Sequence, residues 1–227
     1  MSYKLKSGKV LRQSLSPAEY RELFRHFFSS ACKKTTSYKF ALVSAILQSL
    51  PDGIQGPEGE SIPYAVLFEH FTESLWESAV RRGQRQQAKN SKGNVSRAEQ
   101  IFIAEVKKEP TLSEKEFREF ETGMQKRLVQ KIEKACKTYV LGALYGDFRG
   151  CLYAFDLEGD SILVPHAACE FLRKHTDELL RLNDLHRELF LVEINMKFSK
   201  PGTVLEGWAA FEAARKMAEE PEIQQKK

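Results

Sequence analysis

Apolar residues recur at helical spacing along most of the chain. Ser16-Pro17-Ala18-Glu19 has the order of a helix start, because Ser16 can cap the first turn, Pro17 suits the first helical position and Glu19 can complete a capping box. Apolar side chains then follow at three- and four-residue steps: Tyr20, Leu23, Phe24, Phe27 and Phe28. The pattern predicts a first amphipathic helix.

Two further helices are predicted over residues 37–50 and 64–82. The first is apolar on nearly all sides, which indicates a central core helix, and Pro51-Asp52-Gly53 ends it. An irregular loop is expected from there to Pro63, because Gly56, Pro57 and Gly59 break any periodic pattern. The second helix places its apolar residues on one side and should pack on the first.

The second half of the chain begins with more helices. Ser96-Arg97-Ala98-Glu99 resembles a cap for a short helix, and a long amphipathic helix is expected over residues 114–140. Later helices are predicted from Pro165 to Lys174, over residues 177–197 and over residues 203–220.

A small sheet is predicted between these helices. Apolar and aromatic residues flank Gly146-Asp147-Phe148-Arg149-Gly150, so residues 139–155 are interpreted as a strand pair closed by a tight turn. A second turn is expected over residues 156–160 and a third strand over residues 161–164. The predicted class is mostly α (α+β), a multi-helix fold with one small antiparallel sheet near residues 139–164.

Length and composition allow two domain organisations. With 227 residues and 42% hydrophobic content, the chain can form a single compact domain over residues 1–227. Alternatively, a helical part over residues 1–82 and a second part over residues 95–220, which contains the sheet, are joined by a basic loop at 83–94. That loop has no periodic apolar face.

Composition also limits the compartment and the chemistry. The sequence contains no apolar run that predicts a membrane span or a secretory signal, so we expect a cytoplasmic protein with no membrane partner. The cysteines have no paired spacing and stand in apolar or helical contexts, which favours buried free thiols over zinc ligands: Cys32, Cys136, Cys151 and Cys169.

Positive charge is concentrated in one segment. The net charge is only +4, but residues 81–97 contain six cations and no acid: Arg81, Arg82, Arg85, Lys89, Lys92 and Arg97. Such a segment can neutralise phosphates without reading bases, and a solvated loop is an equally good interpretation. Lys33, Lys34 and Lys39 would extend the basic surface if the first helix junction lies nearby.

The turn near residue 148 carries two opposite charges. Asp147 and Arg149 are expected to project from it and to dock a partner protein. The alternative is a structural turn in which Asp147 caps backbone N–H groups and Arg149 is solvated.

Catalytic motifs are largely missing from the sequence. His166, Asn183 and His186 occur in the order of an HNH nuclease, yet they stand at a helix start and within leucine-rich helices, where structural roles are the better interpretation. Phosphate-binding, nucleotide-binding and zinc-peptidase fingerprints do not occur, so no cofactor and no metal site is predicted.

Several segments resemble a known family. Thr36-Ser37-Tyr38-Lys39-Phe40, residues 68–76 and 140–155, Phe171-Leu172 and the helix ending in Ile194-Asn195 resemble the amino-terminal helical region of bacterial HNH-type endonucleases of defence systems. The likeness extends from about residue 19 to residue 195. In those proteins the region precedes a nuclease module whose catalytic histidines and zinc-binding cysteines have no matching positions here.

The resemblance implies a role in defence without cleavage. It suggests a non-enzymatic accessory subunit of an antiphage or DNA-processing complex, for example the Lamassu type with an SMC-like ATPase and an effector nuclease. Such a subunit would dock partner proteins and contact nucleic acid non-specifically. The alternatives are an HNH-related metal-dependent endonuclease that uses His166, Asn183 and His186, and a purely protein-binding subunit.

Overall fold

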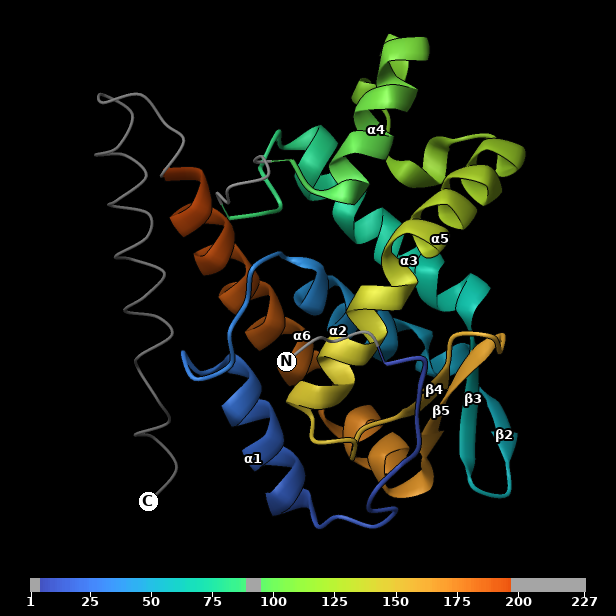
Figure 1. The fold of residues 1–227 in the computed structure, drawn as a ribbon, viewed down its shortest axis with the longest axis vertical. Helices are drawn as coiled ribbons and strands as arrows, with labels where there is room; N and C mark the ends of the chain where they lie inside the picture. Colours follow the sequence, from blue (N-terminus) through green and yellow to red (C-terminus); the bar gives the residue numbers. More distant parts are fainter. Residues whose placement is uncertain (1–4, 89–94, 197–227) are drawn as a thin grey trace.

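Helices make up most of the fold. The computed structural model describes residues 5–88 and 95–196, which form a group of helices with a small antiparallel sheet at one side (Figure 1). This confirms the predicted mostly helical α+β class. The α-helices in the described part are α1 (Pro17–Phe28), α2 (Tyr38–Ser49), α3 (Tyr64–Trp76), α4 (Arg97–Lys108), α5 (Thr122–Asp147) and α6 (His166–Met196). Shorter helical turns are η1 (Leu50–Asp52), η2 (Glu77–Arg81), η3 (Pro110–Glu114) and η4 (Phe117–Glu119).

Two helices begin at the capping boxes expected from the sequence. In α1 the Glu19 backbone N–H donates to the Ser16 hydroxyl, while the Glu19 carboxylate accepts from the Ser16 backbone N–H. Ser96 and Glu99 form the same reciprocal pair at the start of α4. Each pair satisfies backbone donors that a helix start leaves without intrahelical partners.

Helix α2 is the centre of the core, as predicted. Almost all of its side chains are buried, and it packs against α3, α5 and α6. From α6, the Asn183 side-chain amide donates to the Phe40 carbonyl at 3.0 Å and to the Ser44 hydroxyl at 2.8 Å. Asn183 therefore fixes α6 against α2, because the side chains of Asn183 and Ser44 are both buried and need hydrogen-bond partners.

The sheet combines strands from distant parts of the chain. Its order is β1-β4-β5-β3-β2, with every pair antiparallel. The strands are β1 (Ser7–Gly8), β2 (Ile54–Gly56), β3 (Gly59–Pro63), β4 (Ala154–Asp156) and β5 (Ser161–Pro165). The irregular loop predicted before Pro63 is therefore wrong, because its glycines close the β2–β3 hairpin.

Gly59 shows why that hairpin needs a glycine. Its φ is 152°, and a Cβ at this position would lie 2.1 Å from the Val164 carbonyl oxygen. Only a residue without a side chain allows β3 to approach β5 this closely.

The strand predicted over residues 139–145 is helical. These residues form the last part of α5, and of the predicted strand pair only β4 is extended. The physical reason is a four-residue apolar series that continues through the glycines, Ile132, Cys136, Val140 and Leu144, all of which are buried. The tight turn lies after the helix, where Arg149 and Gly150 have positive φ values of 53° and 66°.

Helix α6 is continuous where two helices were predicted. It runs from His166 to Met196 through the polar residues near 175, and the Thr176 hydroxyl donates to the Leu172 carbonyl at 2.8 Å. The helix predicted over residues 203–220 lies outside the described residues.

The two predicted parts share one hydrophobic core. Trp76 of α3 makes edge contacts with Phe102 of α4 and Phe120, and its indole N–H donates to the Lys115 carbonyl at 3.1 Å. The sheet likewise pairs β3 with β5.

Within residues 5–88 and 95–196, no helix combines the length and apolarity that crossing a membrane requires.

Candidate functional site

The described cations of residues 81–97 have different surroundings. Arg81 ends η2, Arg82 follows it, and Arg97 begins α4. Lys89 and Lys92 lie outside the described residues. The structure therefore divides the predicted nucleic-acid-binding set.

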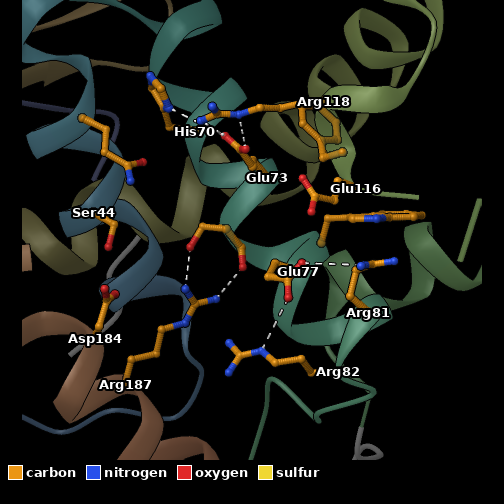
Figure 2. Close-up of a pocket in the computed structure, with 14 residues that line it drawn as sticks. Ser44, His70, Glu73, Glu77, Arg81, Arg82, Glu116, Arg118, Asp184 and Arg187 are labelled. Atoms are coloured by element: carbon orange, nitrogen blue, oxygen red, sulfur yellow. Dashed lines mark hydrogen bonds and ion pairs between the residues drawn. The ribbon is translucent and has the colours of Figure 1, made fainter. Parts of the chain in front are cut away.

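Arg81 and Arg82 are engaged with carboxylates. Glu77 lies 3.8 Å from the Arg81 Nε and 4.0 Å from the Arg82 Nε, and Arg82 also reaches Glu188 of α6 at 2.7 Å. Figure 2 shows Glu77 between the two arginines. Arg81 donates in addition to the Glu114 carbonyl. These contacts hold η2 against the neighbouring elements, so the positive charge of both arginines is largely compensated.

The other described members of the set have different surroundings. The Arg85 backbone N–H donates to the Asn195 side chain at 2.8 Å, and the Asn195 amide returns a bond to the Arg85 carbonyl. Arg97 is exposed on the outer side of α4, and its guanidinium donates to the neutral Gln100 side chain at 3.2 Å. Arg97 is therefore placed to meet a phosphate directly.

Two of the three lysines near the first helix junction, Lys34 and Lys39, have structural contacts, whereas Lys33 is exposed. Lys34 donates to the carbonyls of Ser29 and Cys32, and its ammonium lies 4.9 Å from the centre of the Phe27 ring. Burial lowers the pKa of Lys34. Lys39 forms an ion pair instead, so these two lysines do not extend a basic surface as the sequence suggested.

Asp147 does not project outward, contrary to the sequence-based expectation. It is the last residue of α5, and its carboxylate lies 2.6 Å from the Lys39 ammonium, with side chains only 11% and 12% exposed. Arg149 is exposed. The two charges therefore have different surroundings: Asp147 joins α5 to α2, whereas Arg149 is exposed at the surface.

A polar pocket lies between α2, α3, α6 and the connection that leads to α5. Its volume is about 390 Å³, and Figure 2 shows side chains that line it. The charged side chains that line it are equally divided between acids and arginines: Glu73, Glu77, Glu116, Asp184, Arg81, Arg82, Arg118 and Arg187. Arg118 binds both carboxylate oxygens of Glu73, which ties the connection to α3. A pocket of balanced charge gives no general attraction to polyanions.

Arg187 forms the floor of this pocket. It is 6% exposed, and its guanidinium donates to the Ser74 carbonyl at 2.7 Å and to the Ser78 hydroxyl at 2.8 Å. Burial lowers its pKa to about 10. The nearby Asp184 has a raised pKa because burial disfavours its charged form. The arginine joins α6 to α3 through hydrogen bonds to neutral groups.

The sequence-based interpretation missed this pocket, although a signal was present. Asn183 and Arg187 stand four residues apart on the buried side of α6, between Leu179 and Leu191. Polar residues within an apolar helical stripe need buried partners, and here those partners come from α2 and α3. The partners could not be identified from the sequence because they depend on helix packing.

The residues considered for an HNH site do not converge. His166 is exposed at the start of α6, 3.3 Å from the Pro57 carbonyl, whereas Asn183 lies about 26 Å further along the helix axis. His186 stacks on Phe28 with ring centres 4.7 Å apart. Burial lowers the pKa of His186. The three residues cannot hold one metal ion together, and their positions agree with the structural roles favoured by the sequence.

The cysteines, which could otherwise act as nucleophiles, are buried. All four cysteines are free and buried, as expected. Burial raises the pKa of each thiol, to about 12 for Cys136 and Cys169, so the reactive thiolate is disfavoured. Across the described residues, no histidine hydrogen-bonds to a serine or cysteine, and no group of three His, Cys, Asp or Glu side chains could hold a metal ion.

Comparisons of the chain with protein-family models, curated proteins and solved structures found no match.

Proposed function

We propose that the protein is a non-enzymatic accessory subunit of a bacterial defence or DNA-processing complex, which docks partner proteins and contacts nucleic acid without sequence preference. The observation that carries this proposal is the placement of the candidate catalytic side chains. His166, Asn183 and His186 stand apart in packing or helix-start positions, and the thiols are buried. This arrangement favours binding over catalysis.

Charge supports the nucleic-acid part of the proposal. Arg97 is exposed and has no carboxylate partner among residues 5–88 and 95–196. The chain as a whole has a net charge of +4. An exposed excess of cations gives salt-sensitive binding to phosphates that does not depend on base sequence.

Binding is tested by fluorescence anisotropy with a short labelled DNA duplex of arbitrary sequence. We expect binding at about 50 mM salt that weakens steeply by about 200 mM, because each neutralised phosphate releases condensed counterions. An unrelated duplex of equal length should bind equally well. Failure to bind either duplex or the matching RNA at low salt would contradict the nucleic-acid part of the function.

The same samples test for catalysis. Plasmid and single-stranded DNA should stay intact with magnesium, manganese or zinc. Cleavage that is lost in His166→Ala would show that the protein is an endonuclease and would overturn the non-enzymatic assignment.

Partner docking is tested by pairwise co-expression with the products of neighbouring genes. We expect a stable complex, most informatively with an SMC-like ATPase, that survives size-exclusion chromatography. Separate elution of every pair would contradict the accessory role.

A further inference from the structure

Helices α4 and α5 carry an unusual share of the positive charge. Together they contain eight Lys or Arg residues and four Asp or Glu residues. Their formal charge is therefore +4, which equals the net charge of the whole chain. How much of this excess can attract a ligand depends on how many of these cations the fold itself neutralises.

The carboxylates of these two helices are already engaged. Glu99 completes the cap of α4, and Asp147 binds Lys39 at 2.6 Å. Glu133 lies 3.0 Å from Lys137. Glu105, the fourth, forms ion pairs with two lysines. None of these acids is left to neutralise the remaining cations of the outer faces.

Glu105 joins the two helices. The same carboxylate oxygen lies 3.0 Å from the Lys108 ammonium of α4 and 2.7 Å from the Lys131 ammonium of α5. The hydrogen bond from Lys131 lowers the pKa of Glu105. The end of α4 therefore lies beside the middle of α5, and their exposed cations belong to one surface.

The exposed cations of the two helices form what we call the basic helix patch. Its members are Arg97, Lys107, Lys108, Lys126, Arg127, Lys131 and Lys134, all of which are exposed. On α5, Arg127, Lys131 and Lys134 follow one another at four- and three-residue steps and Lys126 adjoins Arg127, so the members form one stripe about 12 Å long. Because one DNA strand presents a phosphate every 3.4 Å or so along the helix axis, such a stripe can meet several phosphates.

The chemistry of the stripe distinguishes between polyanions. From residue 126 to residue 134, the outer stripe of α5 contains only Gln130 between its cations and no large apolar side chain, whereas a membrane-surface helix needs apolar residues to insert. The stripe also has no aromatic residue on which unpaired bases could stack. A duplex, which presents only its phosphate backbone to such a surface, fits best.

Acidic residues flank the patch on one side. The connection between α4 and α5 contains five of them, Glu109, Glu114, Glu116, Glu119 and Glu121. Glu116 lines the polar pocket together with Arg118, and Glu119 accepts from the Glu116 backbone. They limit the basic surface at the connection and leave the outer face of α5 positive.

We infer that the basic helix patch binds the phosphate backbone of duplex nucleic acid, and that Arg81 and Arg82 do not. This inference rests on the proposed nucleic-acid function and assigns it to a surface. Arg97 is the member shared with the segment singled out in the sequence.

The test replaces Lys126, Arg127 and Lys134 with Gln in one variant. These exposed side chains have no carboxylate partner among the described residues, so circular dichroism should show an unchanged fold. Duplex affinity at about 50 mM salt should fall at least tenfold, and the log–log salt slope should decrease by roughly 0.9 for each phosphate that is no longer neutralised. Lys107→Gln with Lys108→Gln is a second variant on the other helix, which should also weaken binding.

The matched control changes the charge equally on another face. Arg21, Lys174 and Arg181 are exposed on α1 and α6, and their replacement with Gln should leave binding within about twofold of the parent. An equal loss of affinity in this control would show that binding depends only on net charge, and it would overturn the assignment of binding to the basic helix patch.

The remaining outcomes distinguish a failure of the basic helix patch as the binding surface from a failure of the proposed nucleic-acid binding. If Arg81, Arg82 and Arg85→Gln abolishes binding while the α5 variant binds normally, the patch is wrong and the function stands. If the parent binds neither DNA nor RNA, both are wrong. Tighter binding to anionic phospholipid vesicles or to polyglutamate than to the duplex would also overturn the inference.

Discussion

At the scale of single residues, position along the chain does not reveal which charges face solvent. Asp147 and Arg149 are two residues apart, yet the Asp147 side chain is only 11% exposed and pairs with Lys39, whereas Arg149 is exposed. The sequence predicts that residues 147 and 149 lie near a turn. It does not predict their different environments, because Lys39 comes from a helix more than a hundred residues earlier in the chain.

This difference predicts opposite sensitivities at the two positions. Asp147→Asn leaves the Lys39 ammonium poorly compensated and should lower the free energy of unfolding by about 3 kcal/mol. Arg149→Ala should change it by less than about 0.5 kcal/mol, because the side chain is exposed. Urea denaturation monitored by circular dichroism measures both values, and equal decreases would show that the ion pair contributes little.

The lowered pKa of His186 predicts that the stability of the protein depends on pH. Burial and the nearby Lys34 lower its pKa in the folded state, so the unfolded chain binds the proton more readily. Its contribution to stability is complete above the unfolded pKa, about 6.5, and is lost as the pH falls through the lower folded pKa. His186→Phe keeps the stack on Phe28 and removes the titration. The stability lost by the parent between about pH 8 and pH 5 should therefore exceed that lost by the variant, and identical pH profiles would contradict this role.

At the scale of secondary structure, the sequence predicted helices better than strands. The capping boxes at Ser16 and Ser96 mark true helix starts, because their signal is local. The strand predicted over residues 139–145 is wrong, because the four-residue apolar series of α5 continues through these residues. The β2–β3 hairpin was missed because its pairing with β5 involves residues about a hundred positions away.

The corrected turn predicts opposite effects for two glycines next to or within α5. Gly150 has φ of 66°, and a Cβ there would lie 2.6 Å from the Tyr145 hydroxyl, so Gly150→Ala should cost about 1–3 kcal/mol. Gly123 is in the first turn of α5, where the nearest atom would be 3.9 Å away, and Gly123→Ala should stabilise the protein by up to about 1 kcal/mol. Thermal denaturation of both variants checks the signs. A neutral Gly150→Ala would mean that the turn relaxes at little cost.

At the scale of the whole molecule, packing joins the two parts that the sequence left separable. The sheet pairs β3 from the first part with β5 from the second, and Trp76 packs between α4 and the connection to α5. The candidate site likewise depends on contacts between distant parts of the chain. Its cations could be identified from the sequence, but their division between a neutral pocket and the basic helix patch depends on which carboxylates the fold brings to each of them.

These contacts predict that both parts unfold together. A Trp208→Phe variant leaves Trp76 as the only tryptophan, and its ring is fully buried where α3, α4 and the connection meet. Its fluorescence reports separation of the two parts, whereas far-UV circular dichroism reports the loss of helix throughout the chain. In a single cooperative unit the two urea transitions have the same midpoint and slope. We therefore expect coincident curves, because exposing Trp76 also removes the cover of the α2–α3 core. A fluorescence transition at lower urea, followed by a separate loss of helix, would instead show that residues 1–82 and 95–220 are two domains.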